Sequence, residues 1–102
     1  GWAGFTPVAE TSEISVYYCL PNEVVDRDPG LPKRLFAALA HWFFENTYFS
    51  HLVAVVRTDN REMREVVKQT GFYHRESKVI EGMQADVFQM LSPSMQSYLM
   101  SA

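Results

Sequence analysis

Asn60-Arg-Glu-Met-Arg-Glu-Val-Val-Lys-Gln-Thr-Gly71-Phe72 is the stretch of sequence that decides the fold, because it has the pattern of an amphipathic helix. Apolar side chains recur at helical spacing on one face: Met63, Val66, Val67 and Thr70. Asp59 is the expected N-cap, with Glu62 completing a capping box. Gly71 stands where a helix commonly ends in the left-handed conformation. We therefore predict a helix over 60–70 with a defined start and stop.

The segments on either side of this helix give the order β-β-α-β-α-β-β. The expected elements are strands at 1–8 and 13–20, a loop at 22–30, a helix from about Pro32 to Asn46, a strand at 51–57, the helix at 60–70, and a ribbon of strands at 72–80 and 83–91 that turns at Glu81-Gly82. The helix that joins strand 13–20 to strand 51–57 implies a right-handed parallel crossover. We expect an α/β (α+β) domain with a mixed, mostly antiparallel sheet around a central parallel β-α-β crossover.

Composition favours a single compact domain over residues 1–102. The net charge of −3 argues against a nucleic-acid surface or an anionic membrane as the main partner. No apolar run approaches the roughly 20 residues that span a bilayer. Cys19 is the only cysteine, which excludes an internal disulfide and favours a cytoplasmic setting. Cys19 is expected to be a small buried hydrophobe rather than a nucleophile.

Histidines and the C-terminal tail add little to a functional interpretation. His41 is expected on a helix face and His51 at a strand edge, and the three histidines have no metal-ligand spacing, so no metal site is predicted. The tail at 92–102 begins with Pro93 as a breaker. It carries a small apolar docking patch: Tyr98, Leu99 and Met100.

Asn60 followed by Gly71-Phe72, behind an apolar strand, resembles the Asn…Gly-Phe signature of the GNAT superfamily of acyl-CoA-dependent N-acyltransferases. Arg27-Asp-Pro-Gly-Leu-Pro32 stands where that family has its Gln/Arg-x-x-Gly-x-Gly/Ala pyrophosphate loop. Asp86-Val-Phe-Gln-Met90 is similar to the closing strand of the family. The resemblance implies that strands 14–20 and 51–57 splay apart and that acetyl-CoA, as co-substrate, lies in the gap.

The resemblance also implies which residues hold the cofactor. They are Leu20, Arg27, Gly30, Leu31, Lys33, Arg34 and Asn60. Backbone N–H groups at a helix start favour an anion such as a pyrophosphate. Pro29 and Pro32 depart from the family pattern, because each removes a backbone donor from this loop. Lys33 and Arg34 offer side-chain charge instead.

The catalytic groups are not singled out by spacing. Many family members carry a tyrosine proton donor seven residues after the asparagine, and that position is Val67 here. Attack of an amine on a thioester needs a base for the ammonium proton. The candidates are Glu13, Tyr17, Tyr18 and Tyr73. Tyr17 and Tyr18 also fit as core or rim aromatic residues.

The chain is also shorter than the family pattern, since the usual first strand and leading helices would precede the matched part. An uncovered first strand with Trp2 and Phe5 leaves an edge and an apolar surface, so we expect a homodimer or larger assembly that buries this face. Two functions remain open. One is an acetyl-CoA-dependent N-acetyltransferase with an unknown amine acceptor. The other is a non-catalytic GNAT-like binding or assembly module of a mobile-element or phage type, which accounts for Pro29, Pro32 and Val67 together.

Overall fold

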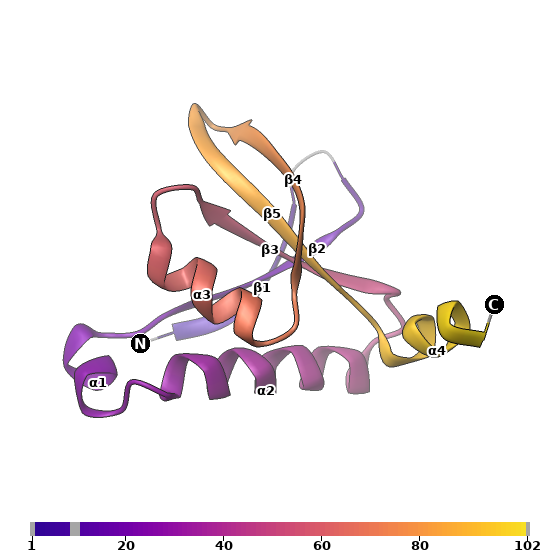
Figure 1. Ribbon diagram of the computed structural model, residues 1–102, viewed down its shortest axis with the longest axis horizontal. Coiled ribbons are helices and arrows are strands. Elements are labelled where there is room, and N and C mark those ends of the chain that lie inside the picture. The colour runs from indigo at the N-terminus through magenta and orange to yellow at the C-terminus, as the bar shows by residue number, and fades with distance from the viewer. Residues whose placement is uncertain (1, 9–10, 102) are drawn as a thin grey trace.

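The computed structural model describes residues 2–8 and 11–101 and has an α+β fold (Figure 1). Its elements are β1 (Trp2–Pro7), β2 (Ile14–Cys19), α1 (Asn22–Arg27), α2 (Leu31–Asn46), β3 (His51–Arg57), α3 (Arg61–Gln69), β4 (Tyr73–Ile80), β5 (Met83–Leu91) and α4 (Pro93–Ser101). The predicted strands and the two long helices are confirmed to within two residues at each end. Gly1 and part of the predicted turn, Ala9 and Glu10, lie outside the described residues.

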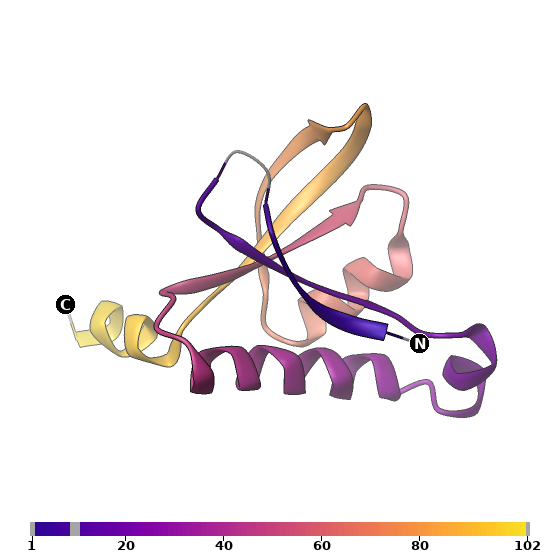
Figure 2. The same cartoon turned by 180° about the vertical axis from the view of Figure 1, so that it is seen from behind.

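The sheet has five strands in the order β1-β2-β3-β5-β4. β2 and β3 run parallel, joined by the α1–α2 crossover, and the other neighbours are antiparallel, as predicted. The β4–β5 hairpin turns through Glu81 and Gly82, whose φ angles of 51° and 78° match the type of two-residue turn that suits a right-twisted ribbon. Figure 2 shows β1 and β2 from behind, crossing in front of the β4–β5 hairpin.

One face of the sheet, the core face, is covered by α2 and α3. These helices meet it with Phe36, Phe43 and Val67, which are at most 3% exposed. The strands contribute the remaining buried side chains: Val16, Leu52, Ala54, Val56 and Phe88. Truncation of a fully buried phenylalanine such as Phe36 costs about 3–5 kcal/mol, so this layer dominates the stability of the domain.

The opposite face, called the open face here, carries the alternate residues of the same strands. Five polar side chains lie on the open face. They are those of Glu13, directly before β2, Ser15 and Tyr17 on β2, His51 on β3 and Gln89 on β5. Tyr17 packs over β1, where a side chain at Gly4 would come within 3.0 Å of the Tyr17 hydroxyl. Polar side chains on this face are partly exposed: that of His51 is 29% exposed and that of Glu13 is 16% exposed.

Two local predictions around the helices were wrong. Residues 22–27 form the short helix α1 rather than a loop, although none of its residues is buried. The N-cap of α3 is Asn60, whose side chain accepts a hydrogen bond from Met63 N–H at 3.2 Å. Asp59 pairs with Arg57 at 3.0 Å instead and does not cap the helix. Gly71 does end α3, with φ of 99°.

Three expectations about surfaces also need correction. Trp2 and Phe5 lie on opposite faces of β1: Trp2 is 64% exposed, whereas Phe5 stacks on Trp42 on the core face. Cys19 is exposed at the last residue of β2, where its only strand neighbour is Trp2 on the edge strand β1. Pro93 begins helix α4 rather than breaking the structure, and Ser92 caps it by accepting a hydrogen bond from Met95 N–H.

α4 presents part of the predicted apolar patch. Tyr98 and Leu99 are exposed on α4, whereas the structure does not describe the side chain of Met100. Within residues 2–8 and 11–101, none of the helices has the length and apolar character needed to cross a bilayer.

Candidate functional site

The parallel strands β2 and β3 pair at a single position, Ser15 with Val53, and diverge beyond it. By contrast, β1 pairs with β2 along the whole of Trp2–Pro7. Backbone polar groups of Val16–Cys19 that point toward β3 therefore have no strand partner there and can bind a ligand. This divergence was predicted, and it opens a slot between the two strands.

A groove of about 750 Å³ occupies the mouth of this slot. It lies between the end of β2, helix α1 and the first turns of α3. The residues that line it are Tyr18, Cys19, Leu20, Asn22, Val25, Asp26, Pro29, Pro32, Asn60, Glu62, Met63, Glu65 and Val66. A cavity of this size and shape is typical of a small-molecule or cofactor site.

The predicted cofactor residues divide into two groups. Leu20 and Asn60 line the groove, so the structure brings these two together. Arg27, Gly30, Leu31, Lys33 and Arg34 lie next to it, at the end of α1 and the start of α2, without lining it. Only the prolines of this loop, Pro29 and Pro32, reach the groove wall.

The loop before α2 has few backbone donors for an anion. Leu31 N–H is taken by Asp28 O at 3.0 Å, and Pro32 has no N–H. Lys33 keeps a first-turn N–H that has no partner within its own helix. The Arg34 guanidinium forms an ion pair with Asp28, and both side chains are about half exposed. Asp28 engages only Nη2 of Arg34, so the carboxylate offsets the guanidinium charge while the other N–H groups of Arg34 can still donate to a phosphate.

The groove wall is acidic. Asp26, Glu62 and Glu65 contribute carboxylates, and none of its lining residues is cationic. Burial, and to a lesser extent the Glu62 charge, raises the pKa of Tyr18 above its usual value. Tyr18 therefore stays protonated and can donate a hydrogen bond to a molecule in the groove. The three carboxylates of the groove wall repel negative charge.

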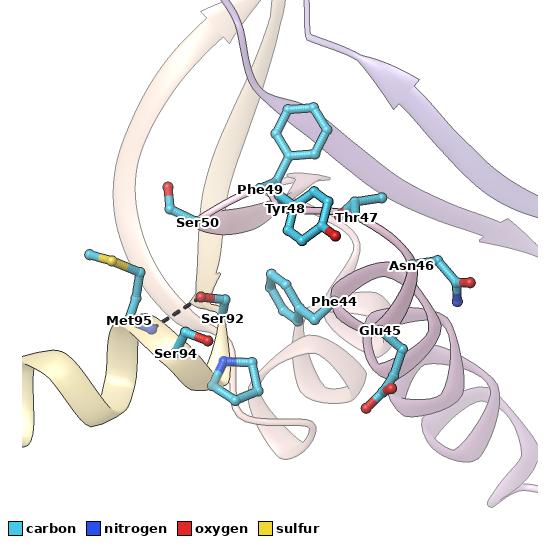
Figure 3. A pocket seen from close by; sticks show the side chains of 11 residues that line it. Phe44, Glu45, Asn46, Thr47, Tyr48, Phe49, Ser50, Ser92, Ser94 and Met95 are labelled. Carbon is cyan, nitrogen blue, oxygen red and sulfur yellow. Dashed lines mark hydrogen bonds between the residues drawn. The ribbon is translucent and has the colours of Figure 1, made fainter.

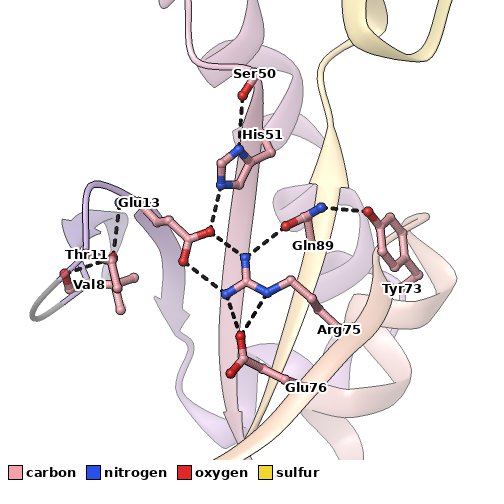
Figure 4. A network of polar contacts seen from close by, with 9 residues as sticks. All are labelled: Val8, Thr11, Glu13, Ser50, His51, Tyr73, Arg75, Glu76 and Gln89. Carbon is pink, nitrogen blue, oxygen red and sulfur yellow. Dashed lines mark hydrogen bonds and ion pairs between the residues drawn. The ribbon is translucent and has the colours of Figure 1, made fainter. Parts of the chain in front are cut away.

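A polar network lies on the open face, at the N-terminal end of the β2–β3 pairing (Figure 4). Glu13 is its centre and is 16% exposed. Its Oε1 accepts a hydrogen bond from Arg75 Nη2 at 3.0 Å, and its Oε2 contacts Arg75 Nη1 and His51 Nε2, the latter at 2.7 Å. The Arg75 hydrogen bonds lower the pKa of Glu13 to about 2, against the opposing effect of burial.

The remaining predicted catalytic residues do not converge. Tyr17 lies on the open face against Trp2, and Tyr18 packs edge-on against Phe36 on the core face. Tyr73 accepts a hydrogen bond from Gln89 Nε2 at 2.6 Å. Val67, at the family's proton-donor position, is fully buried in the core. Two of the four candidates therefore share one network: Glu13 lies at its centre, and Tyr73 joins it through Gln89 and Arg75 (Figure 4).

Sequence reasoning missed His51 and Arg75 as partners of Glu13. Arg75 lies at a bulge in β4, between His74 and Glu76, which turns its side chain across the open face. A second missed cluster lies on the core face, where Asp86 is 6% exposed and accepts a hydrogen bond from Ser77 at 2.6 Å. That hydrogen bond is the main reason why the pKa of Asp86 is lowered.

A second groove, of about 590 Å³, lies where α2, β3 and α4 meet (Figure 3). Phe44, Tyr48 and Phe49 line it together with Met95 from α4, and Ser50 reaches its edge. Tyr48 is fully exposed. In the described part of the chain, no three His, Cys, Asp or Glu side chains come close enough together to hold a metal ion.

Comparisons with known proteins address the fold. No family model matches the chain, and no curated protein matches its sequence. Solved structures do match it. A ribosomal-protein-S5-alanine acetyltransferase from Vibrio fischeri superposes with a TM-score of 0.76 at 13% identity, covering 91% of this chain and 54% of that one.

Two further structures agree. An aminoglycoside acetyltransferase in complex with coenzyme A has a TM-score of 0.71 at 14% identity, covering 82% of this chain and 48% of that one. A GNAT-family acetyltransferase from Bordetella pertussis has a TM-score of 0.70 at 14% identity, covering 85% and 55%. The chain thus spans about half the length of the structures it matches. At these identities the likeness shows the fold alone.

Proposed function

From the GNAT fold of this chain, we propose that it binds acetyl-CoA in the slot between β2 and β3 and transfers the acetyl group to an amine. The observation that carries the proposal is the divergence of these strands beyond Ser15 and Val53, with a groove of about 750 Å³ at the mouth. Coenzyme A bound to a neighbour of the same fold supports the choice of ligand class. The lone Cys19 suits a reducing, cytoplasmic setting.

The residues present fit parts of this ligand. Unpaired backbone groups of Val16–Cys19 suit the amides of a pantetheine chain, which needs both donors and acceptors. Lys33 and Arg34 suit the pyrophosphate, although the Asp28 carboxylate offsets part of the Arg34 charge. Tyr18 is the only tyrosine that lines the groove, so we expect its hydroxyl to donate a hydrogen bond to the leaving sulfur. Many members of the resembling family assign this role to a tyrosine at the position of Val67.

The reaction requires that the amine nitrogen attack the thioester carbonyl carbon. A C–N bond forms, the C–S bond breaks, and the sulfur leaves as a thiolate that takes a proton. The amine nitrogen loses a proton to a base. The acidic groove wall of Asp26, Glu62 and Glu65 favours cations over anions, so binding of the pyrophosphate would depend on Lys33 and Arg34 at the start of α2.

A non-catalytic binding or assembly module is the second candidate function. The observation that favours it is Val67, which is fully buried and cannot donate a proton. Pro29 and Pro32 add to it, because they line the groove without offering donors. Fold does not fix function, so ligand binding must decide between the two candidates.

The deciding experiment is a thermal shift with acetyl-CoA and with CoA. A ligand at 100 times its Kd adds about 2.7 kcal/mol, which for a domain of this size raises the Tm by on the order of 10 °C. Gly30→Asp should abolish the shift, because a carboxylate there repels phosphate. Ala38→Asp, on an exposed part of α2, adds the same charge away from the groove and serves as the control. A wild-type protein without a shift at millimolar cofactor would favour the non-catalytic module.

A further inference from the structure

The network on the open face lies at the point where the two halves of the sheet meet. Glu13 and His51 each precede the only β2–β3 pair, Ser15 with Val53, by two residues. Side chains two residues apart in a strand share a face. The Glu13–His51 contact therefore bridges β2 and β3 on the open face, immediately beside the vertex of the slot (Figure 4).

Glu13 itself is a poor proton acceptor. Both of its oxygens are occupied, by Arg75 on one side and by Arg75 and His51 on the other. These contacts hold the pKa of Glu13 at about 2, so its carboxylate has almost no affinity for a proton near neutral pH. The carboxylate on the central strand can thus orient a neighbour but cannot serve as the base.

His51 is held in one tautomer by this arrangement. An ionised carboxylate only accepts hydrogen bonds, so Nε2 must carry the proton that it shares with Glu13. The lone pair is then left on Nδ1, which lies 3.1 Å from Ser50 Oγ. Ser50 is exposed and borders the groove of Figure 3, so water reaches the hydroxyl that faces Nδ1.

Three charged groups surround His51 in this network. They are Glu13 from β2 and Arg75 and Glu76 from β4. The other histidines lack this setting, since His41 is exposed on α2 and His74 contacts Asp86 on the core face.

We infer that His51 is the proton acceptor for the amine in the acetyl transfer, with Glu13 and Ser50 as positioning residues. This inference rests on the proposed function. As the amine nitrogen bonds to the carbonyl carbon and the C–S bond breaks, its proton passes through the Ser50 hydroxyl or one water to His51 Nδ1. The thiolate takes its proton from Tyr18 or solvent, and His51 later returns its proton to solvent.

The first arm of the test compares His51→Gln with His41→Gln. A glutamine at 51 can still donate to Glu13 but cannot take a proton. Acetylation of phenethylamine, spermidine and an alanine-starting peptide is followed by mass spectrometry from pH 6 to 9.5, because the exposed Cys19 would react with thiol reagents. We expect His51→Gln to lower kcat about 100-fold at pH 7, with unchanged KM for acetyl-CoA. For the alanine-starting peptide the deficit should shrink at pH 9.5, where its α-amine is largely neutral and solvent takes up a proton more readily, and His41→Gln should match the wild type.

The second arm needs no activity. Nitrogen-15 NMR at high pH should show that the neutral His51 ring is the tautomer with a proton on Nε2 and none on Nδ1. Glu13→Gln should remove the preference for this tautomer. A ring protonated at Nδ1, or equal rates for His51→Gln and wild type at every pH, would overturn the inference. A deficit that is the same at all pH values would also overturn it, since it would indicate a structural role.

Failure of the proposed function is recognised separately. A wild-type protein that shows no thermal shift with acetyl-CoA and transfers no acetyl group refutes the transferase, and the role of His51 with it. A normal thermal shift combined with transfer that does not depend on His51 refutes only the inference made here.

Discussion

Glu13→Gln tests whether the ion pairs of the open face hold the two halves of the sheet together. Arg75 reaches from β4 to Glu13 on β2, across the strands that carry Gln89 and His51. Backbone pairing between β2 and β3 is limited to one position, so these side-chain bonds are a main polar link between the halves. The substitution keeps the shape of the side chain and removes its charge.

The expected loss of stability in Glu13→Gln follows from the lowered pKa of Glu13. A decrease from 4.5 to about 2 corresponds to at most about 3.5 kcal/mol, since each pKa unit is worth about 1.4 kcal/mol. Arg75 is 25% exposed and the network borders solvent, so screening reduces this figure. We expect Glu13→Gln to lower the free energy of unfolding by about 1–2 kcal/mol at pH 7.

The contribution of Glu13 to the free energy of unfolding decreases as the pH falls. The pKa of Glu13 in the folded state lies below its unfolded value, so its contribution is complete above pH 4.5 and is lost as the pH falls toward 2. Urea unfolding at pH 7, 5, 4 and 3 should show the difference between wild type and Glu13→Gln shrinking over the acid range. Glu23→Gln, which removes an exposed carboxylate from α1, is the control. Equal free energies at pH 7, or a difference that persists unchanged at pH 3, would refute this reasoning.

Three further predictions concern the slot, a helix cap and assembly. Asp28→Asn frees Arg34 for phosphate and should tighten acetyl-CoA binding by about 2- to 5-fold in calorimetry, as expected for a modest surface ion pair; weaker binding would show that Asp28 organises the loop instead. Asn60→Ala removes the bond to Met63 N–H and should cost about 1 kcal/mol in urea unfolding, whereas Asn60→Asp should retain most of the stability. Size-exclusion chromatography with light scattering should give a molecular mass above the 11.7 kDa of one chain, and Trp2→Ser should lower this mass. A monomer at tens of micromolar would contradict the expected homodimer.

The fold was largely predictable because its strongest signals are local. Strand 51–57 contains the continuous apolar run 52–56, and the structure buries four of these five side chains, those of Leu52, Val53, Ala54 and Val56. The Glu81-Gly82 turn sets the register of the hairpin, since both residues adopt positive φ. Helix α1 was missed because its six residues bury nothing and so leave no periodic pattern.

The site was less predictable because its contacts are long-range. Glu13 and Arg75 are 62 residues apart in the chain, and a bulge in β4 aims the arginine across two intervening strands. No spacing rule connects such residues. The choice of Asn60 over Asp59 as the N-cap had a similar cause, because both residues suit the position and Asp59 pairs with Arg57 instead.

The single β2–β3 pair has a mechanical consequence. The β1–β2 hairpin and the β3–β5–β4 ribbon are joined by strand pairing only at Ser15 and Val53, so a ligand bound between β2 and β3 beyond this point would contact both parts of the sheet. Amide hydrogen exchange along Val16–Cys19 would therefore report ligand binding directly, since the backbone groups that face β3 exchange solvent for ligand as their hydrogen-bond partner.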